Sequence, residues 1–273
     1  MTEISFRGAA QKGICYLGSL KFLEDNNLWS IKKTKKISCV SIGAILSALY
    51  VIGYTNDEIL HIAIDIDFPS IQDYYFKDYT MFEGSVLKKK ITNYFAKKVP
   101  ENITMRELYA ITNIDLIISV TSLEEGMHYI DKTYDYKLID VVLASCTIPF
   151  VFKPYKIEGS ELTYIDGGTI DNFPIHILDK GALGFTIHGE TENNFFEKFL
   201  SLIKSKIEPK RNIHDYHIIY INIGHYTVNF DINKDDIVTM YYVGYNEMKR
   251  NVDIYYKYLH YDSYKNVLKQ LGL

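Results

Sequence analysis

The chain has 273 residues, with 47% hydrophobic and 23% charged content, which is ordinary for a globular protein that buries a core of its own. Its formal net charge of −4 gives no general reason to expect nucleic acid as a partner. The three cysteines, Cys15, Cys39 and Cys146, lack C-x-x-C spacing, and their odd number argues against a disulfide scaffold and favours a reducing compartment.

The first residues, "MTEISFRGAA", lack the basic start and the long apolar region of a signal peptide. Nor do about 18 apolar residues follow one another anywhere, as a membrane span would require. We therefore expect a cytoplasmic protein whose contact with membranes, if it makes any, is peripheral.

The first notable turn is "RGAAQKG", which follows a short predicted strand, Ile4 to Phe6. From Gly13 onward, apolar residues recur at three-residue spacing, which predicts a helix. A turn in this context exposes free N–H groups at the positive end of the helix, which suits an anion or a developing oxyanion. A dinucleotide-binding loop would prefer glycine at Ala10 and an acidic residue about 20 positions further on. Neither condition is clearly met, so an ordinary turn and an anion cradle both stay open.

The second turn contains Ser41. The basic stretch "KKTKK" is interpreted as a solvated loop, Ile37 to Val40 as a strand, and a helix begins near Ile42. This is the outline of a nucleophile elbow, G-x-S-x-G, in which a serine stands at a sharp bend between strand and helix. Gly43 fits the pattern, whereas Cys39 replaces its first glycine. The alternative is that Ser41 merely caps the helix, since serine is a favoured N-cap.

The middle of the chain leads to a buried strand. Residues 68 to 112 are aromatic and are predicted to be mostly helical, while Ile114 to Val120 is a continuous apolar run typical of a buried strand. Residues 127 to 131 predict another strand. The segment "DVVLASCTIPFVF" predicts a short helix stopped by Pro149, because proline lacks the N–H donor that a helix needs.

The third turn, "YIDGGTIDNFP", places Asp166 at a strand end with two glycines behind it. Glycines there allow a tight turn that leaves the carboxylate uncovered. The alternative is that Asp166 only forms an Asx turn with its own backbone. Asp171 lies past the turn and is the second-choice carboxylate.

The last third alternates in the same way. Gly184 to His188 and Ile218 to Ile223 predict strands, and Asp235 to Leu259 predicts a long helix. No repeat, linker or domain boundary interrupts the chain. Alternating strands and helices therefore predict one α/β domain spanning residues 1–273, with a central sheet between helices.

The histidines do not form a site. No H-x-x-x-H or H-E-x-x-H pair suggests zinc, and none of them lies in a glycine-marked turn. His176 is nearest to the third turn but is expected to belong to the following helix. If Ser41 is activated, an aspartate is then the available base. The eight histidines are His61, His128, His176, His188, His214, His217, His225 and His260.

The three turns, in this order and context, resemble the patatin-like phospholipase family. The family's glycine-rich block, close to G-G-G-x-[KR]-G, corresponds to residues 8–13, its G-x-S-x-G elbow to residues 39–43, and its D-G-[GA] block to residues 166–168. Asn172 and Pro174 complete a typical continuation, and "LASCTIPFVFKPYKI" is similar to the family's approach to its aspartate. The resemblance covers about residues 4–178.

This resemblance implies a three-layer α/β/α sandwich with a central, mostly parallel sheet. It implies a Ser-Asp dyad in which Ser41 attacks a carboxylic ester of a phospholipid or related lipid and Asp166 is the base. The oxyanion would be held by N–H groups around Gly8, Ala9 and Ala10. Neither a metal nor an organic cofactor is implied, and contact with a lipid surface is expected.

The remaining block residues are expected to support this site. Lys12 would add positive charge near a lipid headgroup. The glycines, Gly13, Gly43, Gly167 and Gly168, would give the turns the space that they need.

The chain departs from the family pattern at three positions. Ala9 and Ala10 replace glycines of the first block, and Cys39 replaces the first glycine of the elbow. If either alanine must adopt a positive φ, the backbone carries strain of about 1 kcal/mol or more. The alternative to an enzyme is therefore a degenerate member of the family that binds lipid or regulates a partner.

Overall fold

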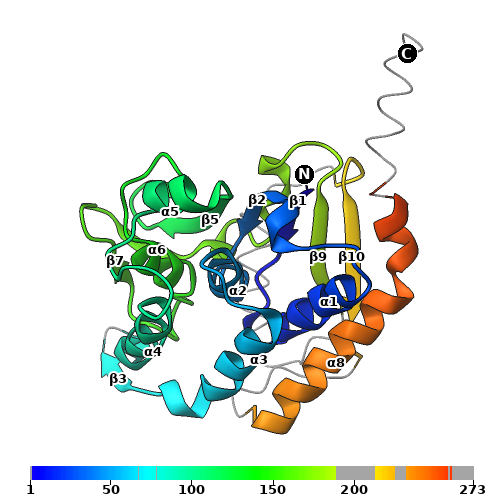
Figure 1. The fold of residues 1–273 in the computed structure, drawn as a ribbon. Helices are drawn as coiled ribbons and strands as arrows, with labels where there is room; N and C mark the ends of the chain where they lie inside the picture. The colour runs from blue at the N-terminus through cyan, green and yellow to red at the C-terminus, as the bar shows by residue number, and fades with distance from the viewer. Residues whose placement is uncertain are drawn as a thin grey trace.

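A mixed, mostly parallel sheet runs through the centre of the molecule in the computed structural model (Figure 1). The structure describes residues 2–66, 68–77, 79–188, 213–224, 232–257 and 259. The parallel strands are β1 (Thr2–Phe6), β2 (Thr34–Cys39), β5 (Asp115–Ser122), β9 (Leu183–His188) and β10 (His217–Asn222). The antiparallel strands are β6 (Gly126–Ile130), β7 (Tyr155–Lys156) and β8 (Thr163–Asp166). Within the described residues, hydrogen-bonded pairing links the strands in the path β10-β9-β1-β2-β5-β8-β7, and β6 pairs with the edge of β5 opposite to β2 and β8.

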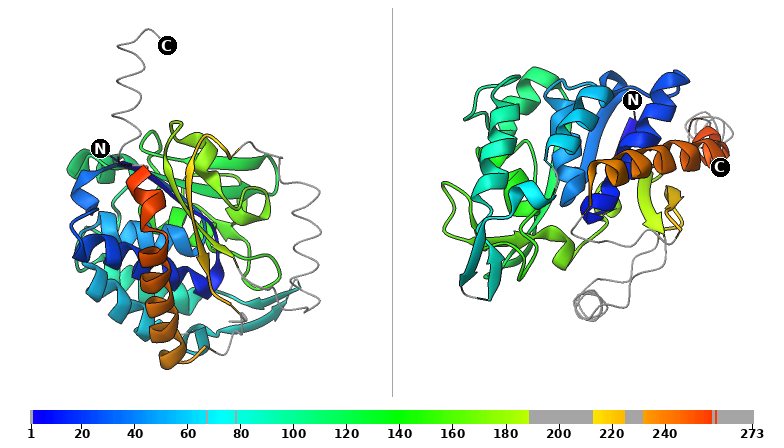
Figure 2. Two further views of the ribbon diagram at one scale, coloured as in Figure 1. Left: turned by 90° about the vertical axis from the view of Figure 1, so that its right-hand side faces the viewer. Right: turned by 90° about the horizontal axis from the view of Figure 1, so that it is seen from below.

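Helices cover the sheet and complete the three-layer α/β/α sandwich, which confirms the predicted fold class. The helices are α1 (Ile14–Asp25), α2 (Ile42–Val51), α3 (Asn56–Asp65), α4 (Ser85–Phe95), α5 (Met105–Thr112), α6 (Leu138–Ser145) and α8 (Lys234–Arg250). Figures 1 and 2 show α1 and α8 lying along each other across one face of the sheet, with α3 beside them. Helix α2 packs against β2, β5 and α6.

Short 3₁₀ segments and a hairpin connect these elements. The 3₁₀ segments are η1 (Ala10–Gly13), η2 (Ile31–Lys33), η3 (Phe68–Ile71), η4 (Gly167–Thr169) and η5 (Pro174–Ile177). The hairpin is a separate two-stranded sheet of β3 (Tyr74–Lys77) and β4 (Thr80–Phe82). Three of these segments shape the candidate site. Segment η1 follows β1, η4 follows β8, and η5 follows the third turn.

Local sequence explains the elements nearest the centre. All eight residues of β5 are buried, as expected for a strand with covered faces in the middle of a sheet. Helix α3 begins with a capping box, in which the Glu58 N–H donates to Thr55 Oγ1 at 3.3 Å and the Thr55 N–H donates to Glu58 Oε2 at 2.7 Å. This exchange satisfies two donors that a helix start otherwise leaves without partners.

Three sequence predictions need correction. The stretch "KKTKK" is not wholly a loop, because β2 begins at Thr34. Lys36 Nζ forms an ion pair with Glu3 Oε1 of β1 at 3.4 Å. Residues 68–112 contain α4 and α5 but also the β3–β4 hairpin. Its first strand is mostly exposed and its second is only three residues long, so neither shows a clear period in the sequence. Helix α8 ends at Arg250 rather than at residue 259, and residues 252–257 form a separate helical turn; residue 258 lies outside the described part.

In the part of the chain that the structure describes, no helix is both long enough and apolar enough to cross a bilayer.

Candidate active site

The register of the sheet brings the second and third turns together. Ile118 of β5 pairs with Cys39 of β2 and, on its other side, with β6. Val120 pairs with Asp166 of β8 and, again on the other side, with β6. Strands β2 and β8 therefore lie on the same side of β5, and their carboxyl ends face each other. The β5 residues with which these two ends pair, Ile118 and Val120, are two positions apart, which is about 7 Å along a strand. Ser41 follows two residues after the end of β2, so both predicted dyad residues lie at this junction.

Ser41 has the backbone of a nucleophile elbow rather than of an ordinary cap. Its φ of 57° and ψ of −127° lie outside the regions that residues with a Cβ normally adopt. The residue precedes α2, yet its side chain makes no capping hydrogen bond. Its N–H donates to Ser145 Oγ at 2.8 Å instead. The hydroxyl is thus not used as a helix cap, and 7% of the residue's surface is exposed.

Asp166 is held at the end of β8 by its own turn. Its Oδ1 accepts a hydrogen bond from the Gly168 N–H at 2.7 Å, and its N–H donates to the Thr147 carbonyl at 2.8 Å. The Asx turn that we considered as an alternative is therefore present, and it orients the carboxylate. A side chain at Gly167 would place its Cβ 2.2 Å from the Ser119 carbonyl oxygen, so only glycine lets the chain pass so close to β5.

The end of α6 contacts both predicted dyad residues. Ser145 Oγ accepts from the Ser41 N–H and donates to the Ser119 carbonyl at 2.8 Å, and the Thr147 carbonyl accepts from the Asp166 N–H. Cys146 lies between these two contacts; burial, and then the nearby Asp166 charge, raise the pKa of its thiol. Sequence reasoning missed Ser145, because its part in the site depends on a contact with a residue 104 positions away.

The first turn lies against both of the others. The Gly8 N–H donates to the Asn172 carbonyl at 3.0 Å, and Asn172 Nδ2 donates back to the Gly8 carbonyl at 3.1 Å. A Cβ at Gly13 would lie 2.4 Å from the Ile42 side chain, so glycine there allows η1 to approach the start of α2. Lys12 lies in η1 between these contacts.

Glycine supplies space, not unusual dihedral angles, at the other block positions. A Cβ at Gly43 would lie 2.9 Å from Phe6 Cβ, and one at Gly168 would lie 2.4 Å from Asn172 Oδ1. Neither glycine has a positive φ. The close packing of the three turns on one another therefore accounts for these residues.

The two alanines of the first turn differ in conformation. Ala9 has a φ of −148°, whereas Ala10 has a φ of 46° and carries the strain of the left-handed region. Among the described residues, neither the Ala9 N–H nor the Ala10 N–H has a hydrogen-bond acceptor. Because the Gly8 N–H is engaged with Asn172, the turn's first N–H groups without an acceptor in the described part of the chain are those of Ala9 and Ala10.

Cys39 fits its position without the properties of glycine. It is the last residue of β2, so its backbone is extended, and its Sγ donates to the Ile117 carbonyl at 3.7 Å. Burial raises the pKa of its thiol to about 12. The thiol therefore stays neutral near pH 7 and does not place a charge beside Ser41.

Asp171, the second-choice carboxylate, belongs to a different cluster. It is fully buried, and Tyr129 donates its hydroxyl to Asp171 Oδ2 at 2.7 Å. His176 Nδ1 lies 3.7 Å from the same oxygen, and His176 is in a 3₁₀ segment rather than in an α-helix. These contacts give Asp171 a structural role behind the third turn. His225 and His260 lie outside the described residues.

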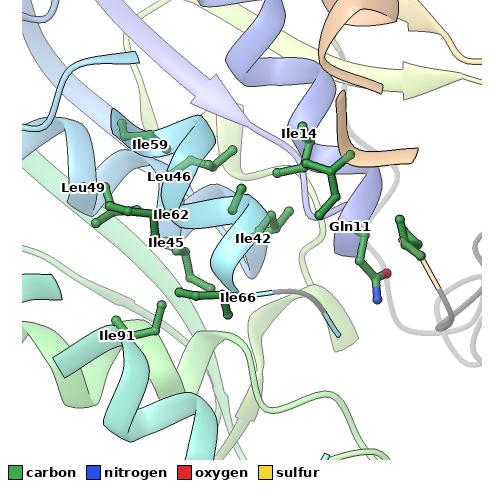
Figure 3. A pocket seen from close by; sticks show the side chains of 13 residues that line it. Gln11, Ile14, Ile42, Ile45, Leu46, Leu49, Ile59, Ile62, Ile66 and Ile91 are labelled. Carbon is green, nitrogen blue, oxygen red and sulfur yellow. The ribbon is translucent and has the colours of Figure 1, made fainter. Parts of the chain in front are cut away.

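An apolar pocket begins beside the elbow. Of its thirteen lining residues, Gln11 is the single polar one, and the others include Ile42 and Ile45 of α2 and Ile62 of α3 (Figure 3). Gln11 belongs to η1, and its Oε1 is buried without a hydrogen-bond partner in the described part of the chain. The pocket thus connects the first turn and the residue after Ser41 to a wall of isoleucine and leucine side chains.

No group of three or more histidine, cysteine or acidic side chains within the described ranges is placed to hold a metal ion.

Comparison with known proteins assigns this arrangement to a family. The sequence of residues 4–179 matches the family described as Patatin-like phospholipase. The uncharacterized protein R571 of Acanthamoeba polyphaga mimivirus is 30% identical over 230 residues, which is 78% of this chain and 72% of that protein. The probable lipid hydrolase 463L of Invertebrate iridescent virus 6 is 27% identical over 221 residues, covering 77% of this chain and 72% of that protein.

Two solved structures share the fold. The crystal structure of VipD from Legionella pneumophila aligns with a TM-score of 0.69 and 16% identity, over 92% of this chain and 66% of the VipD chain. The type III effector ExoU from Pseudomonas aeruginosa aligns with a TM-score of 0.52 and 12% identity, over 93% of this chain and 53% of the ExoU chain. At these identities the likeness concerns the fold alone, and this chain spans about half the length of ExoU.

Proposed function

The chain belongs to the patatin-like phospholipase family, and on that premise we propose that it is a lipid acyl hydrolase. It cleaves carboxylic esters of phospholipids or related lipids, with Ser41 as nucleophile and Asp166 as general base. The observation that carries this proposal is the junction of β2 and β8, where the strained Ser41 backbone and the Asp166 carboxylate come from facing strand ends.

In the first half of the reaction, Ser41 Oγ attacks the ester carbonyl carbon while the Asp166 carboxylate takes its proton. The carbonyl oxygen becomes negatively charged as the tetrahedral intermediate forms. The N–H groups of Ala9 and Ala10, at the start of η1, are the donors that stabilise this charge. Gly8 supports them by holding the turn to Asn172.

Collapse of the intermediate breaks the ester bond. The alcohol part of the lipid leaves with the proton from Asp166, and the acyl group stays on Ser41. Asp166, again a carboxylate, then takes a proton from water, which attacks the acyl-enzyme. Asp166 returns that proton to Ser41 Oγ as the acyl bond breaks and the fatty acid leaves. The isoleucine- and leucine-lined pocket beside Ile42 is the place for the acyl chain, because it offers apolar contact next to the nucleophile (Figure 3).

A second candidate is a lipid-binding protein of the same fold without turnover. The observation that favours it is the positive φ of Ala10, where the family pattern has glycine. Such a protein would keep the apolar pocket and would show no reaction at Ser41. A fluorophosphonate probe separates the two candidates, because it labels only an activated serine.

The central experiment compares Asp166→Asn with Asp171→Asn. Asparagine at either position keeps the volume and the turn hydrogen bonds but is a negligible base. We expect Asp166→Asn to melt within a few degrees of wild type and to lose at least about a hundredfold in kcat, the low end of what general-base assistance contributes. Asp171→Asn is the matched control and is expected to stay within a few-fold of wild type.

Hydrolysis is measured with nitrophenyl esters, phospholipids, lysophospholipids and triacylglycerol, with Ser41→Ala as the inactive reference. If Ser41→Ala hydrolyses these esters as fast as wild type, Ser41 is not the nucleophile. If Asp171→Asn silences the enzyme while Asp166→Asn does not, the base has been assigned to the wrong carboxylate.

A further inference from the structure

The β3–β4 hairpin carries a cluster of exposed apolar side chains outside the catalytic site. In Figure 1 it lies at the lower left edge of the domain, and Figure 2 shows it projecting from the body. We call the cluster the hairpin patch. Its members, with their exposed fractions, are Tyr74 (63%), Phe76 (70%), Tyr79 (92%), Met81 (45%) and Phe150 (46%).

The members of the hairpin patch form one surface. The rings of Tyr74 and Phe76 stack with centroids 5.4 Å apart. The Met81 N–H donates to the Phe150 carbonyl at 3.1 Å, so these two residues are neighbours across adjacent backbones. Tyr79 lies in the turn that joins the strands, next to Thr80. The patch therefore runs from the tip of the hairpin to the segment that supports its base.

The backbone of the hairpin patch is strained. Phe76, Tyr79 and Phe150 have φ values of 44°, 59° and 67°, although bulky residues rarely adopt this region. Strain of this kind concentrates at functional positions, where surrounding structure maintains it. Three of the five patch residues thus adopt an unfavourable conformation while their rings face solvent.

The hairpin connects directly to the pocket and to the dyad. It is inserted between Ile66 and Ile91, which both line the apolar pocket. Strand β4 also bonds to the segment after α6, because the Phe82 N–H donates to the Val151 carbonyl at 2.8 Å. That segment begins at Thr147, whose carbonyl holds the Asp166 N–H. The hairpin is therefore linked through the backbone both to the wall of the pocket and to the segment that holds Asp166.

Two lysines lie at the ring of Tyr75, which belongs to β3 but is not a member of the hairpin patch. The Nζ atoms of Lys77 and Lys153 lie 5.8 Å and 5.1 Å from the centre of the Tyr75 ring. Among the described residues neither lysine forms an ion pair. The nearby Asp73 carboxylate accepts from the Gly84 N–H at 2.9 Å and from Ser85, so it is directed to the start of α4. Aromatic rings beside lysine ammonium groups are the side chains that favour the boundary between lipid headgroups and acyl chains.

We propose that the hairpin patch docks the protein on a phospholipid surface, with its aromatic side chains inserted between headgroups and the two lysines facing phosphates. The inference rests on the proposed function, because a lipid hydrolase must reach substrate that is packed in such a surface. Since the net charge of the chain is −4, docking depends mainly on apolar insertion and occurs on zwitterionic as well as on anionic lipid.

The first test is flotation of the full chain with vesicles of diether phosphatidylcholine, which contain no carboxylic ester to cleave. The variant Phe76→Asn/Tyr79→Asn removes two aromatic rings. Asparagine tolerates a positive φ better than phenylalanine or tyrosine, so this variant is expected to fold. We expect its vesicle partition coefficient to fall at least tenfold, equivalent to about 1.4 kcal/mol. The matched control is Ile111→Asn/Leu123→Asn, whose wild-type side chains are 65% and 57% exposed elsewhere, and it should bind like wild type.

The second test uses fluorescence. The chain has one tryptophan, Trp29, which is 3% exposed, so Tyr79→Trp adds a single surface reporter. Its emission should shift to shorter wavelength with vesicles and should be quenched by brominated acyl chains. Unchanged emission, absence of wild-type binding, or equal binding by the Phe76→Asn/Tyr79→Asn variant each overturns the inference. A dimer in gel filtration that this variant abolishes, without vesicle binding, would assign the patch to a second copy of the chain.

Docking and hydrolysis fail separately. Vesicle binding that depends on the hairpin, together with no Ser41-dependent hydrolysis, would leave the docking surface in place and refute the enzyme. Hydrolysis that depends on Ser41, without vesicle binding, would support the enzyme and refute the docking surface.

Discussion

Ser145→Ala tests whether the elbow is maintained by a hydrogen bond from outside it. The substitution removes a hydroxyl that accepts from the Ser41 N–H and donates to the Ser119 carbonyl, both at 2.8 Å. Ser145 has no exposed surface, so water cannot readily replace the lost partner. The free-energy cost of leaving the Ser41 N–H without an acceptor is about 1–3 kcal/mol.

The elbow can avoid this cost by relaxing. The positive φ of Ser41 is itself unfavourable by about 1–3 kcal/mol. Once Ser145 Oγ no longer holds the Ser41 N–H, the backbone of Ser41 can therefore rotate toward a negative φ and lose this strain. A displacement of about 1 Å at a reacting group can lower the rate about a hundredfold. We therefore expect Ser145→Ala to lower kcat between tenfold and a hundredfold. KM should change less than threefold, because Ser145 is not one of the residues that line the apolar pocket.

The assay is steady-state hydrolysis of a soluble nitrophenyl ester, combined with the rate of fluorophosphonate labelling and with urea denaturation. The matched control is Ser19→Ala. Ser19 is equally buried and donates to the Cys15 and Gly244 carbonyls at 3.0 Å, between α1 and α8. It should lose stability but keep kcat. An unchanged kcat and labelling rate in Ser145→Ala, or an equal loss of kcat in Ser19→Ala, would refute a positioning role for Ser145.

Three further predictions concern the departures from the family pattern and the reaction chemistry. Ala10→Gly removes left-handed strain of about 1–2 kcal/mol, but glycine gives the unfolded chain more backbone entropy, which costs about 0.5–1 kcal/mol of stability; urea denaturation should show a stability between unchanged and about 1.5 kcal/mol higher, and a clear loss would contradict the strain at Ala10. Cys39→Gly should preserve or raise kcat, and a tenfold fall in a well-folded variant would show that Cys39 positions the elbow. Hydrolysis of a soluble nitrophenyl ester should survive excess EDTA because the proposed dyad needs no Lewis acid, whereas loss that calcium or zinc restores would count against the dyad.

Much of the fold could be predicted from local patterns. The apolar run that contains Ile118 predicted β5, and the glycine-marked turns predicted where strands end and helices begin. These signals are local, since each arises within about ten residues of one turn. The order of the turns along the chain resembles the family pattern, which implied that Ser41 and Asp166 belong to one site, and the register of β5 is the physical reason why the two turns lie at one junction.

What could not be predicted depends on contacts between distant segments. Ser145 is an unremarkable serine at the end of a short helix until its contact with the Ser41 N–H is seen. Likewise, in the sequence Asn172 is only one residue of the segment that follows the D-G-[GA] block. The structure shows that its carbonyl accepts from the Gly8 N–H and that its Nδ2 donates to the Gly8 carbonyl. The β3–β4 hairpin was missed for a different reason: the side chains of β3 mostly face solvent, and β4 alternates between buried and exposed side chains over only three residues, which is too short a run to show a period.

The conformation of Ala10 bears on the choice between an enzyme and a degenerate relative. Alanine in the left-handed region is strained, and a turn without constraints would relax toward a negative φ. Here the turn is pinned on both sides, by the paired bonds between Gly8 and Asn172 and by the close approach of Gly13 to Ile42. The pinned turn leaves the Ala9 and Ala10 N–H groups without acceptors among the described residues, as the oxyanion site that we propose requires. Replacing glycine with alanine has therefore raised the energy of the turn without removing its donors, and the geometry favours a working hydrolase.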